Sequence, residues 1–434
     1  MKVSRAVTVK RLVLVLVVAY CGYAAYLTGP AYDRLHGSKE EPVLQRYHGA
    51  DFGGFYTGAT AAARGELHQF TDPDFQRTLQ QSIQTTEATG WKWFNPLPHP
   101  PVLSLITMPI SAFPIREAYW VWVLLSFLSA GLAALVAGRA LVPALTLPLV
   151  ALMLTFEPLW HLVWWGQVDA LILLPVATGF AWLIRSETDR EDLVAGLLIG
   201  FLALVPQYAI LPVLTLLVAR RRAALGMMLT GGVLAAVTLA TIRLDGLRGY
   251  IDFYRSYGKL GNDSTVTERA MFNVRGILFR LDERWGAIHL GLTAFGLIVA
   301  VVSILLAGLT VVVAGRAMAR GRAPDLAASM LVVATVVTAY HTHRQTLVFF
   351  LIPMAVALRR AYLSRRWWLA LLWLVPAGVF HAETAILRVK YPLARYPIQT
   401  YLAPWSVVGI LALAAVLLAM DWVRRHPTAP EYEI

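Results

Sequence analysis

The chain has 434 residues, of which 58% are hydrophobic and only 15% charged, and its mean hydropathy is +0.59. A soluble protein keeps most of its charged residues outside and cannot bury so many apolar ones, whereas a bilayer solvates about 20 apolar residues per helical span. The net charge is +12, and the basic residues lie in short clusters between apolar segments. Clusters of this kind orient membrane helices, so we do not expect nucleic acid as the partner. We therefore expect an all-α polytopic membrane protein.

Apolar segments follow one another along the whole chain, and the first is expected to be retained as a helix rather than cleaved as a signal peptide. Its lone Cys21 can form no internal disulfide. The expected spans are 12–28, 97–113, 117–137, 141–156, 167–184, 193–218, 223–242, 287–315, 326–340, 346–358, 367–380 and 402–422. These make about twelve crossings and place both basic termini in the cytoplasm.

Three polar loops then face outward from a single membrane-embedded domain of residues 1–434: 29–96, 243–286 and 381–401. The proline-containing tract 141–219 allows a second path, in which 141–156 does not cross and 193–218 crosses twice as two short helices. The two paths place Gln167 on opposite faces, and the sequence does not choose between them.

The first outward loop contains an aspartate beside a run of small residues. The segment 53–64, GGFYTGATAAAR, predicts a short interfacial helix with Phe55 and Tyr56 at the lipid boundary. Asp51 precedes it, so it is either an N-cap or a functional acid, and the two roles are compatible. Further along, the prolines of PLPHPP are expected to hold His99 at the membrane surface where the next helix starts.

Four blocks occur in an order typical of one enzyme family: DFGGFYTGATAAARGE, NPLPHPPVLSLITMPISAFP, WWGQVDALILLP and AGLLIGFLALVPQYAILPVLTLL, with MFNVRGIL as a weaker fifth. Together they resemble the bacterial glycosyltransferases of family 87, within the GT-C superfold. Three residues depart from the family pattern. Val205 replaces a usual lysine, Asp169 replaces an asparagine, and His99 lies near an aromatic position. The missing lysine removes an expected phosphate contact.

The resemblance implies a GT-C-type fold with about twelve transmembrane helices and short interfacial helices in the outer loops. It implies an enzyme of the bacterial inner membrane whose active site faces the periplasm. The expected reaction moves a sugar, with mannose as the leading precedent, from a polyprenyl-phosphate donor to a hydroxyl of a glycolipid or glycan, with inversion. Asp51 matches the catalytic aspartate and would act as general base.

The leaving phosphate needs cationic or hydrogen-bonding support. The stretch HTHR supplies His341, His343 and Arg344, and the fifth block supplies Arg275. Polar groups at membrane depth are functional candidates by default. A solvated helix end and half of a metal site are the alternatives for the two histidines, but no further Cys/His cluster supports zinc. We expect no metal and no cofactor, Mg²⁺ at Asp51 being the minor alternative.

Six further residues are candidates for contact with sugar or acceptor. Gln167 and Gln207 are expected to be buried amides, which bind either substrate or a neighbouring helix. The six are Tyr56, Asn95, His99, Gln167, Gln207 and Asn273. A lipid or sugar transporter or flippase is the competing function, because transporters also use broken helices and buried polar groups. The absence of a visible internal repeat and the long first loop disfavour it.

Overall fold

The computed structural model describes residues 11–23, 25–26, 48–87, 94–260, 271–285 and 292–364. Every regular element within these ranges is helical, as the composition predicts, and no strand occurs among them. The predicted spans 367–380 and 402–422, the loop 381–401, and parts of the loops 29–96 and 243–286 lie outside the described residues.

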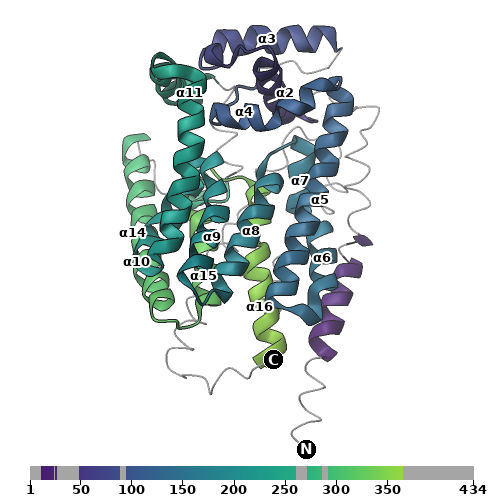
Figure 1. Ribbon diagram of the computed structural model, residues 1–434, viewed down its shortest axis with the longest axis vertical. Helices are drawn as coiled ribbons and strands as arrows, with labels where there is room; N and C mark the ends of the chain where they lie inside the picture. The colour runs from purple at the N-terminus through teal and green to yellow at the C-terminus, as the bar shows by residue number, and fades with distance from the viewer. Residues whose placement is uncertain are drawn as a thin grey trace, which may run out of the picture.

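The helices form a bundle with a layer of short helices over one end (Figure 1). A first helix covers Arg11–Tyr23. The labelled helices are α2 (Ala50–Ala63), α3 (Pro73–Thr86), α4 (Pro101–Thr107), α5 (Ile115–Leu141), α6 (Thr146–Leu154), α7 (Glu157–Trp165), α8 (Asp169–Arg185), α9 (Asp189–Ile199), α10 (Ile210–Ala219), α11 (Arg221–Leu260), α13 (Val274–Trp285), α14 (Leu292–Ala319), α15 (Pro324–Thr338) and α16 (Leu351–Ser364). Short 3₁₀ helices cover Leu67–Gln69, Met108–Ala112, Pro143–Leu145, Gly200–Leu204, Pro206–Tyr208 and Arg344–Phe350.

Four helices of the described part are long and apolar enough to cross a membrane: Ile115–Leu141, Arg221–Leu244, Ala294–Ala319 and Arg344–Leu363. Pro143–Leu154 and Glu157–Trp165, bent by 44°, make a fifth if the pair is one span. The chain is thus an all-helical protein with several membrane-spanning candidates. The full set of about twelve crossings stays a prediction.

The predicted span 97–113 is wrong in this structure. Its helical part is only Pro101–Ala112 and changes to a 3₁₀ helix at Met108. Twelve helical residues reach roughly 18 Å, short of the roughly 30 Å hydrocarbon core. The segment instead packs on α2 at the end of the bundle (Figure 1). The next helix, α5, therefore begins at that same end.

The tract 141–219 departs from the first of the two predicted paths, because 193–218 is not one continuous helix. Residues 143–165 form the bent pair, which is either a broken span or a re-entrant segment, so the path of 141–156 stays a prediction. The prediction that 193–218 forms two short helices is confirmed by α9 and α10. Asp192 at the start of α9 and Arg220 directly after α10 form an ion pair at 3.3 Å. The two helices therefore run antiparallel, and the 3₁₀ turn Pro206–Tyr208 lies at the opposite end of the bundle from Arg220.

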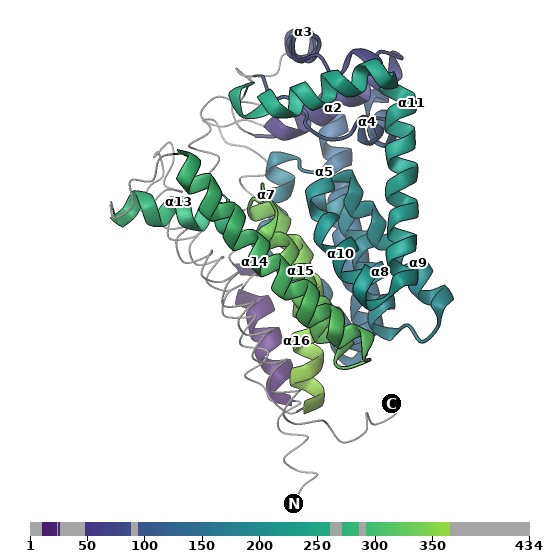
Figure 2. The same cartoon turned by 90° about the vertical axis from the view of Figure 1, so that its left-hand side faces the viewer.

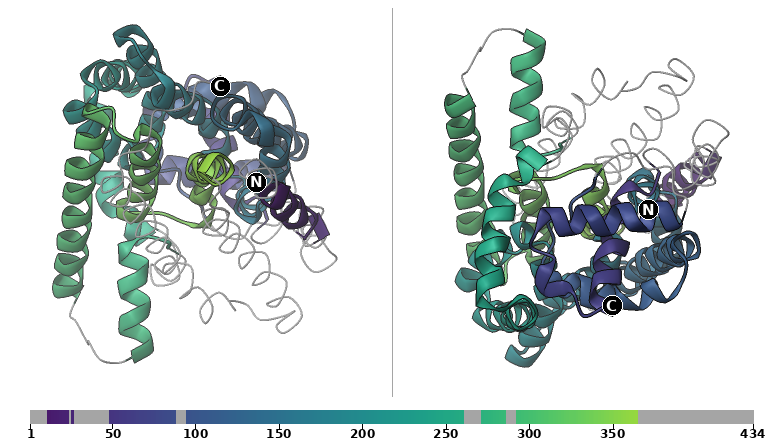
Figure 3. Two further views of the ribbon diagram at one scale, coloured as in Figure 1. Left: turned by 90° about the horizontal axis from the view of Figure 1, so that it is seen from below. Right: turned by 90° about the horizontal axis from the view of Figure 1, so that it is seen from above.

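The two ends of the bundle differ in character. At the lower end in Figure 1, successive helices finish at or near arginines: Arg139, Arg185, Arg220 and Arg316. At the upper end, α11 changes direction at Arg243 (φ 61°), and its second half lies across the bundle together with α2, α3 and α4 (Figures 2 and 3). We name these the basic end and the capped end.

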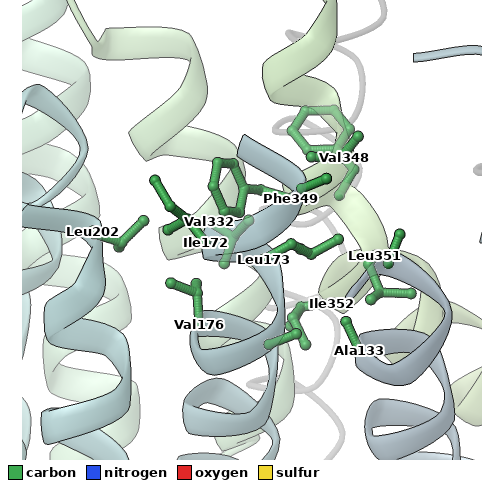
Figure 4. Close-up of a cluster of buried hydrophobic side chains, with 14 of the residues drawn as sticks. Ala133, Ile172, Leu173, Val176, Leu202, Val332, Val348, Phe349, Leu351 and Ile352 are labelled. Atoms are coloured by element: carbon green, nitrogen blue, oxygen red, sulfur yellow. The ribbon is translucent and has the colours of Figure 1, made fainter. Parts of the chain in front are cut away.

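Apolar packing holds α8 at the centre of the bundle. Leu173 and Val176 of α8 contact side chains from α15 and α16, among them Val332 and Ile352 (Figure 4). All four are at most 5% exposed. Membrane helices associate through close packing rather than through release of water. This cluster therefore fixes the position of α8 along the bundle axis, and with it the position of the residues at the capped end of α8.

Close approach of α9 to α11 requires glycine at residue 196. A Cβ atom there would lie 1.9 Å from the carbonyl oxygen of Ala223, which is backbone and cannot turn aside. We expect Gly196→Ala to push the two helices apart and to lower stability by about 2 kcal/mol or more. Thermal unfolding of the purified protein in detergent measures this change.

The matched control is Gly232→Ala on the same α11. A Cβ atom at residue 232 would meet nothing within 4 Å, and alanine favours a helix over glycine by about 1 kcal/mol. The control should therefore unfold at the wild-type temperature or slightly above it. Equal unfolding temperatures for Gly196→Ala and the wild type would show that the α9–α11 contact is not as close as described.

Candidate functional site

Asp51 lies in the first turn of α2, at the capped end of the bundle. The residue before the helix, Gly49, has a left-handed backbone (φ 65°) and donates its N–H to the carbonyl of Trp164 at 2.8 Å. The N-cap interpretation of Asp51 is wrong, because the cap residue is Gly49 and no side chain caps the helix. A carboxylate in the first turn still gains from the helix dipole.

Two amide side chains hold the carboxylate of Asp51. Asn95 donates from Nδ2 to Oδ1 at 2.6 Å, and Gln167 donates from Nε2 to Oδ2. Burial raises the pKa of Asp51 to about 6, and these two hydrogen bonds oppose part of that rise. The group is therefore an oriented carboxylate that ionises near neutral pH, which suits a general base.

Asn95 is held in place by the layer of short helices. Its backbone N–H donates to Oε1 of Gln80 at 2.9 Å, and Gln76 receives the N–H of Leu97 in the same way at 3.0 Å. Both glutamines belong to α3 and are buried. The Asn95 side chain also donates to the carbonyl of Ala50 at 3.1 Å. One function of α3 is thus to fix the amide that orients Asp51.

Gln167 comes from the turn between α7 and α8. The turn passes so close to α2 that a Cβ atom on Gly166 would lie 2.3 Å from Cβ of Phe52. Gly166 also has φ 79°, which other residues rarely adopt. The indole N–H of Trp122 donates to the Gln167 carbonyl at 3.3 Å. The two predicted paths place Gln167 on opposite faces, and its contact with Asp51 places it at the capped end.

A second carboxylate, Asp169, lies two residues beyond Gln167 at the start of α8. Its side chain is buried and close enough to Asp51 for their charges to interact. Asp169 also interacts electrostatically with the phenol of Tyr208. Neither residue was a predicted site residue. The sequence did contain a signal for Asp169, because this residue replaces the asparagine that the family pattern has shortly after Gly166 and Gln167.

The HTHR segment lies between α15 and the following 3₁₀ helix, also at the capped end. Gln207 binds the backbone of His341 twice, donating to its carbonyl at 2.6 Å and accepting its N–H at 3.0 Å. Asn273 donates to the carbonyls of Ala339 at 2.7 Å and Tyr340 at 2.9 Å. Both amides hold the backbone of residues 339–341, and their contact with substrate stays a prediction.

The two histidines of this segment contact each other. Their Nε2 atoms are 2.7 Å apart, so one ring donates a proton to the other. Burial is the main cause that holds the pKa of His341 well below its ordinary value, and the charge of His343 adds to it. The His341 ring is therefore favoured in its neutral form, and one N–H joins the two rings.

Two more predicted residues lie near this pair. Arg275 and His99 both lower the pKa of His341 through their charges, so both approach it. The guanidinium of Arg275 covers the ring of Tyr340 at 4.7 Å. Burial lowers the pKa of His99 to about 4. Its Nδ1 atom is buried with no hydrogen-bond partner among the residues that the structure describes, and so is available to a ligand.

Two predicted residues have other partners in the structure. Arg344 forms an ion pair with Glu157 of α7 at 2.9 Å, and both side chains are at most 11% exposed. Tyr56 donates its hydroxyl to the carbonyl of Phe113 at 2.8 Å. The predicted position of Phe55 and Tyr56 at the lipid boundary is wrong. Both are buried, because α2 lies beneath α3 and Phe55 stacks on Trp122.

The capped end thus brings together a buried carboxylate with its two amides and a group of imidazole and guanidinium nitrogens. Asp51, Asn95 and Gln167 form one part, and His341, His343, His99 and Arg275 form the other. No group of three or more His, Cys, Asp or Glu suited to a metal ion occurs within the described ranges. Polar hydrogen-bonding groups of this kind can bind a sugar and support a phosphate leaving group.

The family model of glycosyltransferase family 87 matches residues 98–340. That range contains Gln167, the third and fourth sequence blocks and most of the second; it begins after Asp51 and ends one residue before His341. Neither the curated proteins nor the solved structures gave a significant match. Since the family model covers more than half of the chain, this protein belongs to glycosyltransferase family 87 and is a glycosyltransferase.

Proposed function

We propose that the protein transfers a sugar, mannose in the first instance, from a polyprenyl-phosphate donor to a hydroxyl of a glycolipid or glycan, with inversion. The observation that carries the proposal is the carboxylate of Asp51, which two amides orient and which no described arginine or lysine neutralises. A general base must be ionised, correctly aimed and not already paired with a cation.

In the proposed reaction, the acceptor oxygen attacks the anomeric carbon while its proton passes to Asp51. The bond between that carbon and the phosphate oxygen breaks, and polyprenyl phosphate leaves with the electron pair. Attack from the side opposite the leaving group gives inversion. Because phosphate is a good leaving group, it needs charge stabilisation more than it needs a proton. We assign that support to Arg275 and to the His341–His343 pair.

The proposed donor is a lipid, so its phosphate must meet the site at the membrane surface. The capped end fits, because it is where helices finish and where α2, α3 and α4 lie (Figures 1 and 2). The arginines at the opposite, basic end favour a cytoplasmic location for that end. We therefore propose a GT-C-type enzyme of the bacterial inner membrane with about twelve crossings, whose site faces the periplasm.

A transfer assay with the reconstituted protein tests the proposal. Proteoliposomes receive polyprenyl-phosphate mannose and a membrane glycolipid extract, and released polyprenyl phosphate and the anomeric configuration of the product are measured. Release that requires the extract and gives an inverted product supports the proposal. EDTA should leave the rate unchanged, since we propose no metal. No release with any polyprenyl-phosphate sugar would instead favour the transporter or flippase.

The pH dependence of the rate should report the base. Because Asp51 must be ionised and its pKa in the free protein is about 6, kcat/KM should be constant above pH 7 and should fall about tenfold per unit well below pH 6. Asn95→Ala removes a hydrogen bond that lowers this pKa, so its profile should move to higher pH. A wild-type profile that stays flat from pH 7 to pH 5 would contradict Asp51 as the base.

A further inference from the structure

The basic end of the bundle contains an open hollow of about 530 Å³. Its walls come from the start of α9, the junction of α10 with α11 and the end of α14. The charged residues that line it are Asp189, Asp192, Arg220, Arg221 and Arg222. It lies at the other end of the bundle from Asp51 and takes no part in the proposed reaction (Figure 1).

The arginines in this hollow outnumber the acids that pair with them. Asp192 is 7% exposed and binds Arg220 at 3.3 Å, which fixes that wall. Arg222 pairs with Asp189 only at 3.5 Å, and both side chains are well exposed. Arg221 is exposed and forms no ion pair within the part of the chain that the structure describes. An exposed arginine beside this fixed ion pair can bind a phosphate through its guanidinium group.

More positive charge lies directly beside the hollow. The turn after α14 includes Gly321, which lines the hollow, and on either side of it Arg320 and Arg322 are exposed. Neither has an ion pair among the described residues. The hollow is therefore positive in sum, and an anion entering it meets arginines from two sides.

The helices above the hollow present an apolar outer face. Exposed side chains occur on α10 (Leu214 and Val218), on α11 (Leu225 and Leu229) and on α14 (Leu309 and Val312). The helices α10 and α14 pack against each other. A membrane-spanning protein turns such a face toward acyl chains. The anion that fits the hollow is thus one joined to acyl chains.

We propose that this hollow binds the headgroup of an anionic phospholipid from the leaflet at the basic end. The phosphate would contact Arg221 and Arg222, and the acyl chains would lie along α10, α11 and α14. Basic hollows between membrane helices on the cytoplasmic side suit such headgroups. The site is separate from the proposed donor site, so its test does not depend on transferase activity.

Native mass spectrometry of the detergent-purified protein tests this with added phosphatidylglycerol and phosphatidylcholine. The wild type should retain phosphatidylglycerol in preference. Arg221→Gln/Arg222→Gln should weaken its binding by roughly tenfold or more, and Arg221→Lys/Arg222→Lys should keep most of it. The matched control, Arg64→Gln/Arg116→Gln, removes two exposed arginines outside the hollow and should bind as the wild type does.

Three results would overturn the proposal. The first is equal retention of phosphatidylglycerol and phosphatidylcholine by the wild type. The second is an equal loss in the control variant, which would mean that total charge alone acts. The third is displacement of the lipid by an equal concentration of soluble glycerol 3-phosphate, which would mean that the hollow takes a free phosphate instead. The unfolding temperature of each variant shows whether it is folded.

Discussion

Asp51→Asn should reduce kcat for sugar transfer by about 10³-fold while leaving donor binding nearly unchanged. The amide has the size of the carboxylate but cannot accept a proton from the attacking hydroxyl. The fold should survive, because Asn95 or Gln167 can turn its amide to pair with the new side chain. Release of polyprenyl phosphate measures the rate, and binding of a labelled donor measures the affinity.

The matched control for this variant is Asp74→Asn. Asp74 also lies in the first turn of a short helix at the capped end, but its side chain is exposed. Its removal should leave kcat within about twofold of wild type, since surface substitutions away from a site have small effects. A wild-type rate in Asp51→Asn would assign the chemistry to another group, and Asp169, a carboxylate whose charge interacts with that of Asp51, would be the next to test.

The part of the site that the sequence predicts best is local. Small residues after Asp51 predict the short helix at 53–64, and the structure has it at Ala50–Ala63. Gly58 shows why these residues are small, because a Cβ atom there would lie 2.4 Å from Oγ of Ser104. A helix face that packs closely can be predicted from the sequence, because only small residues such as glycine and alanine permit the close approach.

The parts that the sequence predicts poorly depend on distant partners. Hydropathy predicts a span at 97–113, but it cannot show that this segment packs on α2. The Arg344–Glu157 pair joins residues 187 positions apart, and the Asp51–Gln167 contact joins residues 116 apart. Contacts between such distant residues leave no local pattern in the sequence. For this reason Arg344, which was expected at the phosphate, is found paired with Glu157 instead.

Gly166→Ala should lower both kcat and stability, although it changes neither a charge nor a proposed substrate contact. The new Cβ atom would meet Cβ of Phe52 at 2.3 Å and its Cα at 3.0 Å, so α2 or the 164–167 turn must move. The same turn supplies Gln167 to Asp51. A displacement of about 1 Å at a catalytic group can cost about 10²-fold in rate. We expect that loss in kcat, with a lower unfolding temperature.

Gly65→Ala separates the clash from the backbone strain. Gly65 has nearly the same left-handed backbone, φ 73° against 79°, but a Cβ atom there would meet nothing within 4 Å. It should cost about 1 kcal/mol in stability and leave kcat unchanged. If both variants lost the same activity, strain rather than displacement would be the cause.

A double variant shows whether Gly166 acts through the base. If the turn matters because it aims Gln167 at Asp51, then adding Gly166→Ala to Asp51→Asn should reduce kcat only slightly further, since the base is already lost. If the two losses multiply, the turn contributes to transfer by a route independent of Asp51. Since α2, α3 and the 164–167 turn all converge on this one carboxylate, we expect the losses not to multiply.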